Sequence, residues 1–279
     1  MTKRAYATLQ QLADPGYLGP DIITQHYDTT LLRMLENASE EIDHMCFRHF
    51  YCYEGTYYFD GSGAVLIPKD DVLSISSIYL DMDGSQNYSS SLSATDYYSY
   101  PVNQYPKTYF KMTYSSGYGG FAPGIKQGVK MTGVFGHGDG ESATPYYDSG
   151  ITGTVATTNG TSLTLSAEGT IQAGHTIRCE SEQMYVSAVS SNGSKTATVE
   201  RQVNGTTAAT HTTKALYIYR YPGPITEAVL LFATAWWKQR ENPTTFMAGD
   251  SVTGQYTISK DIDRIIEGRI DHHIKRYII

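Results

Sequence analysis

The feature that most constrains the fold is a helix-like stretch that is apolar around most of its circumference, AVLLFATAWWKQREN at residues 228–242. When it is placed on a helix from Ile225 at about 100° per residue, its side chains form two apolar stripes and a narrow polar strip. The first stripe holds Ala228, Val229, Phe232 and Trp236, and the second holds Leu230, Ala233 and Trp237. A helix of this kind must be covered on more than one side.

Two arrangements can cover such a helix. Either the chain's own sheet and last helix cover all of it, or one stripe packs in the core and the other against a neighbouring subunit. Because helices are few in a strand-rich chain, we expect the second arrangement. It predicts that Trp236 lies in the protomer's core and that the subunit interface contains Leu230, Ala233 and Trp237.

Periodicity predicts three further helices. A short one covers 8–12, and an amphipathic one begins at Asp28 or Thr29 and buries Leu31, Leu35, Ala38, Ile42, Met45 and Cys46. The helix at 224–242 begins with Pro224, which suits the first helical position, and stops before Pro243. After a loop, a last helix capped by Ser259 presents Ile262, Ile266, Ile270, Ile274 and Tyr277 on one face.

The segments between these helices predict antiparallel strands. From 56 to 135, short alternating runs are bounded by Gly, Asp, Ser and Pro, as in β-hairpins. From 137 to 220 the composition shifts to Thr, Ser, Gly and Ala with repeated Asn-Gly turns, which indicates an inserted β-barrel or sandwich. We therefore expect an α+β chain with a helical and hairpin domain in two parts, 1–136 and 221–279, interrupted by an all-β domain at 137–220.

Composition excludes several classes of protein. With 279 residues, 40% hydrophobic and 18% charged, the chain suits a soluble globular protein, and its net charge of -7 lacks the basic footprint of nucleic-acid or membrane binders. No signal peptide or long apolar run is present, so we expect synthesis in the cytoplasm and no membrane partner. Three cysteines without C-x-x-C spacing favour neither a disulfide framework nor a zinc site.

Four motifs could carry chemistry, and each has a simpler explanation. Asp81-Met82-Asp83-Gly84-Ser85 starts like a calcium loop, but Gln86 and Leu92 stand where that loop needs Gly and Glu, so we expect a hairpin turn. GHGDGE at 136–141 suits a linker, His272-His273 diverge on a helix, and Ser93 with Asp96 lacks a nucleophile turn. We expect no catalytic residue, metal or cofactor, and no enzyme. A hydrolase with carboxylates drawn from distant positions stays open as an alternative.

Several segments occur in a recognisable order. They are Ala38-Ser39-x-x-Ile42-Asp43, Phe47-Arg48-x-Phe50, Tyr58-x-Asp60-Gly61-Ser62-Gly63 and Trp237-Lys238-x-Arg240 before Pro243. In this order they resemble the head-to-tail connector family of tailed phages, also called adaptor or head-completion proteins, over most of 5–136 and 221–245. The insert departs from the short family pattern. Its segments CESEQMYVSAV and VERQVNGTTAATH resemble a small β-module that recurs in phage structural proteins.

The resemblance implies a structural virion protein at the neck. It would form a homo-oligomeric ring of roughly a dozen copies below the portal protein, extend the DNA channel and offer a platform to tail, stopper or nozzle proteins. Genomic double-stranded DNA would pass through without sequence-specific binding, and an acidic lumen would repel phosphates and let it slide.

The resemblance also implies a portal contact in a terminal segment. In this chain that segment would be Ile274, Lys275, Arg276, Tyr277, Ile278 and Ile279, although a frayed tail or a packed final strand explains it equally well. A binding module in which the insert recognises a glycan or another virion protein is the main alternative function.

Overall fold

The computed structural model describes residues 5–20, 28–190, 195–241, 247–250 and 254–275, with only the backbone at 241, 247–250 and 254–263. Contacts divide the chain into two compact units, 1–47 with 146–203 and 207–279, and 48–145 with 204–206. Helices and antiparallel sheets occur together, so the expected α+β class with a barrel is confirmed. In this division the helices belong to the same unit as the barrel, whereas the sequence pattern predicted that they share a domain with the hairpins.

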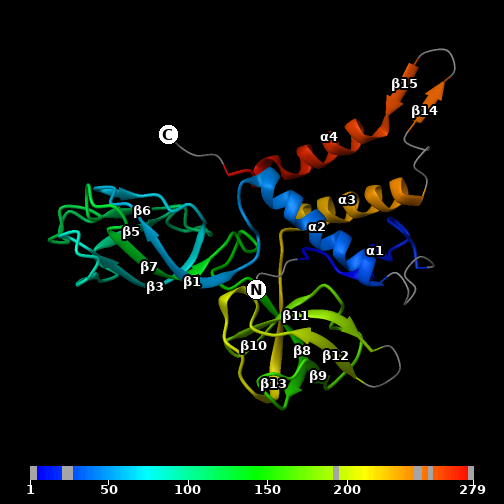
Figure 1. Cartoon of the computed structure of the whole chain (residues 1–279), viewed down its shortest axis with the longest axis horizontal. Coiled ribbons are helices and arrows are strands. Elements are labelled where there is room, and N and C mark those ends of the chain that lie inside the picture. The colour runs from blue at the N-terminus through cyan, green and yellow to red at the C-terminus, as the bar shows by residue number, and fades with distance from the viewer. Residues whose placement is uncertain (1–4, 21–27, 191–194, 242–246, 251–253, 276–279) are drawn as a thin grey trace. The chain divides into compact units, whose positions relative to one another are not determined.

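Helices α1 (Leu9–Leu12), α2 (Asp28–Cys46), α3 (Gly223–Glu241) and α4 (Ile258–Ile270) belong to the first unit (Figure 1). Thr8 and Gln11 form the capping box that starts α1, since each side chain bonds the other's backbone N–H. On α2 the expected face is buried at Leu31, Leu35, Ala38, Ile42 and Cys46. Helix α3 packs against both α2 and α4, and an Arg269–Glu227 ion pair also joins α4 to α3.

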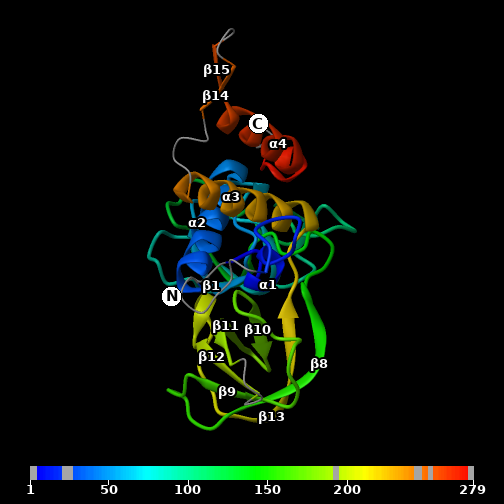
Figure 2. The same ribbon diagram turned by 90° about the vertical axis from the view of Figure 1, so that its right-hand side faces the viewer.

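The insert is a closed barrel in the strand order β10-β11-β12-β9-β8-β13 (Figure 2). Its strands are β8 (Tyr146–Val155), β9 (Ser162–Leu165), β10 (Thr176–Cys179), β11 (Glu182–Val189), β12 (Thr196–Glu200) and β13 (His211–Tyr219). Side chains alternate along each strand, so every second one points into the barrel; in β9, Leu163 and Leu165 are buried while Ser162 and Thr164 are exposed. The enclosed core includes Val155, Leu163, Ile177, Val186 and Leu216. A barrel leaves no open sheet edge.

The N-terminal segment joins the barrel to the helices within the first unit. Leu9 N–H donates to the Ala173 carbonyl at 3.1 Å, and Tyr6 Oη donates to Asp43 of α2 at 2.6 Å. The Tyr6 ring also lies 4.5 Å from that of Tyr221, which precedes α3. These contacts attach the barrel to the helices through the short buried segment 5–8, which we call the N-terminal strap.

The second unit is built from two antiparallel sheets. One has the order β1-β7-β3-β4, with β1 (Tyr53–Phe59), β7 (Val129–Phe135), β3 (Val72–Leu80) and β4 (Ser90–Leu92). The other has the order β2-β6-β5, with β2 (Val65–Leu66), β6 (Tyr109–Met112) and β5 (Tyr97–Tyr100). Their shared core includes Leu66, Ile78, Phe110, Met131 and Phe135.

Two details differ from the sequence prediction. The segment 244–257, expected as a loop, contains a hairpin of β14 (Met247–Asp250) and β15 (Gly254–Thr257), which extends beyond α3 and α4 in Figures 1 and 2. The last helix ends at Ile270 and continues as the 3-10 turn η2 (Asp271–His273). Among the described residues no helix is long and apolar enough to cross a membrane.

Candidate functional site

The α3 residues expected at a subunit interface are covered within the single chain. Leu230, Ala233 and Trp237 are only 4%, 1% and 4% exposed. The expectation of an uncovered second stripe was therefore wrong. The physical reason is that α3 packs on α2 and on α4, so the chain's own helices cover a perimeter that we had reserved for a neighbour.

The adjacent tryptophans also exchange their expected environments. Trp237 is buried, whereas Trp236 is partly exposed and lies with its ring 5.5 Å from that of Phe232. The Arg240 guanidinium lies 5.5 Å from the Trp237 ring centroid, in cation–π geometry. The helical periodicity correctly placed the two rings on different sides of α3, but the core-facing ring is Trp237 and not Trp236 as expected.

Phe47, directly after α2, has both an unusual backbone conformation and an exposed aromatic side chain. Its φ is 52°, in the left-handed region where a residue following a helix is usually Gly or Asn, and its side chain is 67% exposed. Its N–H donates to the His44 carbonyl at 3.3 Å, which closes the last turn. A bulky aromatic residue rarely adopts this conformation, and here most of its side chain is open to solvent.

The expected portal-binding segment is described only in part. Ile274 is partly buried and Lys275 buried, and the Lys275 N–H donates to the Cys46 carbonyl at the end of α2, at 2.8 Å. The chain is thus tied back to its own helix at Lys275. Arg276, Tyr277, Ile278 and Ile279 lie outside the described residues.

The acidic motif of the second unit forms a turn. Asp81 lies between β3 and β4, and its carboxylate accepts backbone N–H groups of Asp83, Gly84 and Gln86 at 2.8–3.3 Å. The expected hairpin turn is therefore confirmed. Its carboxylate oxygens are used by the turn itself.

The glycine-rich loop 136–141 is also held by its own hydrogen bonds. Asp139 accepts the N–H groups of Glu141 and Ser142, both at 2.9 Å, and the His137 ring lies 5.0 Å from Phe50. Ser93 and Asp96 form a similar exposed turn, with Ser93 Oγ donating to the carboxylate at 2.8 Å. No group of three or more His, Cys, Asp or Glu among the described residues could hold a metal ion.

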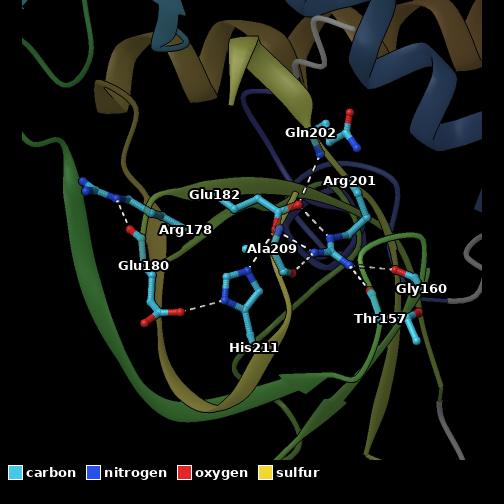
Figure 3. A network of polar contacts seen from close by, with 9 residues as sticks. All are labelled: Thr157, Gly160, Arg178, Glu180, Glu182, Arg201, Gln202, Ala209 and His211. Atoms are coloured by element: carbon cyan, nitrogen blue, oxygen red, sulfur yellow. Dashed lines mark hydrogen bonds and ion pairs between the residues drawn. The ribbon is translucent and has the colours of Figure 1, made fainter. Parts of the chain in front are cut away.

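The most concentrated polar cluster lies in the barrel around the buried Glu182 carboxylate (Figure 3). Glu182 accepts two hydrogen bonds from the Arg201 guanidinium, at 2.6 and 2.7 Å, and one from the Ala209 N–H at 3.0 Å. The same guanidinium donates to the carbonyls of Thr157 and Gly160, at 3.1 and 3.0 Å. One ion pair thus fixes β11, the β8–β9 turn and the loop that leads into β13.

His211 extends this cluster toward solvent. Its Nε2 lies 2.9 Å from Glu182 and its Nδ1 lies 2.9 Å from Glu180, which also pairs with Lys214 at 2.7 Å. Both ring nitrogens can donate at once only in the imidazolium form. Independently of the charge on His211, Glu182 pairs with Arg201 and Glu180 pairs with Lys214, so each carboxylate has a cationic partner.

Burial and hydrogen bonding act in opposite directions on Glu182. Burial alone would raise its pKa, but hydrogen bonds from Arg201, Ala209 and His211 outweigh it, so the pKa of Glu182 is lowered. Beside the N-terminal strap, burial lowers the pKa of His175 to about 4, and its Nδ1 accepts the Gln172 N–H at 3.1 Å. Glu182 is therefore ionised and His175 neutral near pH 7.

These groups suit structural work better than acid–base chemistry. Besides bonding each other and His211, Glu182 and Arg201 bond main-chain groups of the barrel, including the Gly160 and Ala209 carbonyls and the Ala209 N–H. The sequence pattern assigned this cluster no role, because its main partners are far apart in the chain: Glu182 lies 19 residues from Arg201, and Thr157 lies 44 residues from it. The available signal was that CESEQMYVSAV and VERQVNGTTAATH, the segments that resembled a recurring β-module, contain Glu182, Arg201 and His211.

No protein-family model, no curated protein and no solved structure matches the chain.

Proposed function

We propose that this chain is a non-enzymatic structural subunit of a tailed-phage head-to-tail connector, which assembles as a ring of roughly a dozen copies below the portal protein. The ring would extend the channel for double-stranded DNA and carry tail, stopper or nozzle proteins. The observation that carries the proposal is the order of elements. Helix α2 is followed by antiparallel hairpins, and helix α3 returns to pack on α2 after the barrel.

Two further observations support this proposal. The residues whose order resembles the connector family lie on α2, directly after it, on β1 with the following turn, and on α3. The net charge of -7 suits a conduit that does not hold DNA, because a basic lumen would bind the phosphates.

Subunit contacts in such a ring need a surface that the single chain leaves open. Leu230, Ala233 and Trp237 do not provide one. In the described part of the helices, the large exposed apolar side chains are Phe47 just after α2, at 67%, and Ile265 on α4, at 52%. Because Phe47 combines an exposed aromatic ring with a left-handed backbone, we assign it as an anchor for the neighbouring subunit.

This assignment predicts that Phe47→Gly affects the stability of the protomer and the assembly of the ring in opposite directions. Phe47→Gly relieves the left-handed backbone and removes the exposed ring, so the protomer should be as stable as the wild type or up to about 1 kcal/mol more stable. Ring formation on purified portal should nevertheless weaken at least about tenfold, a loss of about 1.4 kcal/mol.

Urea denaturation and co-sedimentation with portal measure the two effects. Phe47→Tyr keeps the ring and serves as the control, and it should assemble normally. Full assembly of Phe47→Gly would remove Phe47 from the interface, whereas a loss of folding in the same variant would show that the residue is structural.

A further inference from the structure

The second unit carries an open hollow whose lining is dominated by tyrosine. Four tyrosines line it, Tyr98, Tyr100, Tyr114 and Tyr118. Its volume is about 540 Å³, which falls within the roughly 300–1,000 Å³ of sites for small organic ligands. The hollow is therefore large enough for a ligand of several rings.

Strands β5 and β6 hold the floor of the hollow in place. Their inward side chains, including Tyr97 and Phe110, pack in the core of the unit, with ring centroids 6.0 Å apart. Because alternate residues point to opposite faces, the outward face carries Tyr98, Tyr100, Tyr109 and Lys111. The strand register pairs Tyr98 with Lys111 and Tyr100 with Tyr109.

Two of the lining rings are fixed and two are open to solvent. Tyr100 stacks on Tyr109 at 4.9 Å with an interplanar angle of 4°, and Tyr118 Oη donates to the Ser91 carbonyl at 3.3 Å. Tyr98 is 59% exposed and Tyr114 is fully exposed. Uncovered aromatic rings gathered beside a preformed hollow are typical of a binding surface.

The charge of the lining narrows the class of ligand. Among the described residues around the hollow, Lys111 alone is charged. Nucleic-acid grooves need several cations along the phosphate backbone, and calcium or magnesium sites need carboxylates. An added peptide strand would pair along the outer edge of β5, whereas this hollow lies over the outward face of β5 and β6.

We propose that the hollow binds a saccharide. The flat C–H face of a pyranose suits stacking on the open rings of Tyr98 and Tyr114, because an aromatic face accepts apolar contact over its whole area. The sugar hydroxyls would exchange hydrogen bonds with the phenol groups and with the Lys111 ammonium. This site is independent of the ring proposed above.

Gly119 offers a way to close the hollow without disturbing the fold. It lines the hollow, its backbone lies outside the left-handed region, and a Cβ placed there would have no neighbour within 4 Å. A larger side chain at this position can therefore be introduced without backbone strain. Because Gly119 is one of the lining residues, we expect a bulky side chain there to restrict ligand binding.

Saturation-transfer NMR on the full chain tests the proposal, with chitotriose, maltotriose and a decaproline peptide as probes. We expect transfer to at least one trisaccharide, with a Kd near about 1 mM. Tyr98→Ala and Gly119→Phe should each weaken that binding at least about tenfold. Tyr217→Ala, which removes a partly exposed tyrosine of barrel strand β13, is the matched control and should bind like the wild type.

Three results would overturn the proposal. They are no transfer to either trisaccharide, binding of decaproline alone, and trisaccharide binding that both hollow variants leave unchanged. Thermal melting of each variant confirms that it is folded before its binding is compared. Since both substitutions lie on an open surface, their melting temperatures should stay within about 2 °C of the wild type.

Discussion

Glu182 is the residue at which the buried polar groups of the barrel converge. Its carboxylate joins Arg201, His211 and the main chain at Ala209, and all of these partners come from other parts of the chain. Removing one member of such a group leaves the others buried without a counter-charge, which costs more than the pair contributes to stability. The cluster of Glu182, Arg201 and His211 therefore acts as a clip that holds these parts of the barrel together, and its loss should destabilise the fold.

Glu182→Gln tests the clip. We expect a loss of about 3–5 kcal/mol in the free energy of unfolding, because the Arg201 charge loses its buried partner. Urea denaturation followed by circular dichroism measures it. The exposed barrel residue Glu168 supplies the matched control, since Glu168→Gln should change stability by less than about 0.5 kcal/mol. A loss below 1 kcal/mol at Glu182 would contradict the clip.

His175 makes stability depend on pH. Its pKa is about 4 in the folded chain and 6.5 when unfolded, so between these values only the unfolded chain takes up a proton. Stability should therefore fall by up to about 3 kcal/mol as the pH drops from 6.5 to 4. Because the pKa of Glu182 is lowered in the folded chain, protonation of this carboxylate causes a further loss of stability once the pH falls below the ordinary pKa of a glutamate.

His175→Asn should flatten this profile between pH 6.5 and 4, because the Asn side-chain oxygen can accept the Gln172 N–H without titrating. Urea midpoints measured across this pH range report the change. His272→Asn, at an exposed position of η2, is the control and should keep the wild-type slope. An unchanged slope in His175→Asn would show that another group is responsible.

At the scale of elements, local patterns predicted what they directly encode. The three-and-four spacing located α2 and its buried face, and the Asn-Gly turns with alternating residues indicated a barrel or sandwich. Hairpin β14–β15 was missed because its Gly, Ser and Thr residues also suit a loop. Periodicity tells which residues share a face of α3, but only the packing of α2 and α4 decides what covers that face.

The two tryptophans of α3 provide the test at this scale. Trp237→Ala should cost about 3–5 kcal/mol, because it removes a buried ring from the helical layer. Trp236→Ala should cost clearly less, since that ring is partly exposed. Thermal melting of the two variants compares them directly. A larger loss at Trp236 would restore the orientation expected from sequence.

The whole molecule combines a strapped barrel, a helical layer and a separate sheet unit. The sequence predicted the class of this fold but not the polar cluster, whose members come together only when the barrel closes. The segment expected to bind the portal, 274–279, contains Lys275, whose N–H bonds the Cys46 carbonyl at the end of α2. This contact gives Lys275 a structural role within the protomer.

Deleting residues 276–279 should therefore weaken docking to portal without unfolding the protomer. Deleting 274–279 should reduce both docking and stability, because the Lys275 contact is lost as well. Co-sedimentation with portal and thermal melting report the two properties. Normal docking by the chain that lacks residues 276–279 would show that the portal contact lies elsewhere on the molecule.

The central claim is that the chain works as one member of a ring on a portal. Native mass spectrometry of the full chain mixed with purified portal protein tests it most directly. We predict a complex whose mass corresponds to one portal and a closed set of roughly a dozen copies of this chain. A strict monomer that never joins the portal at any ratio of the two proteins would contradict the claim.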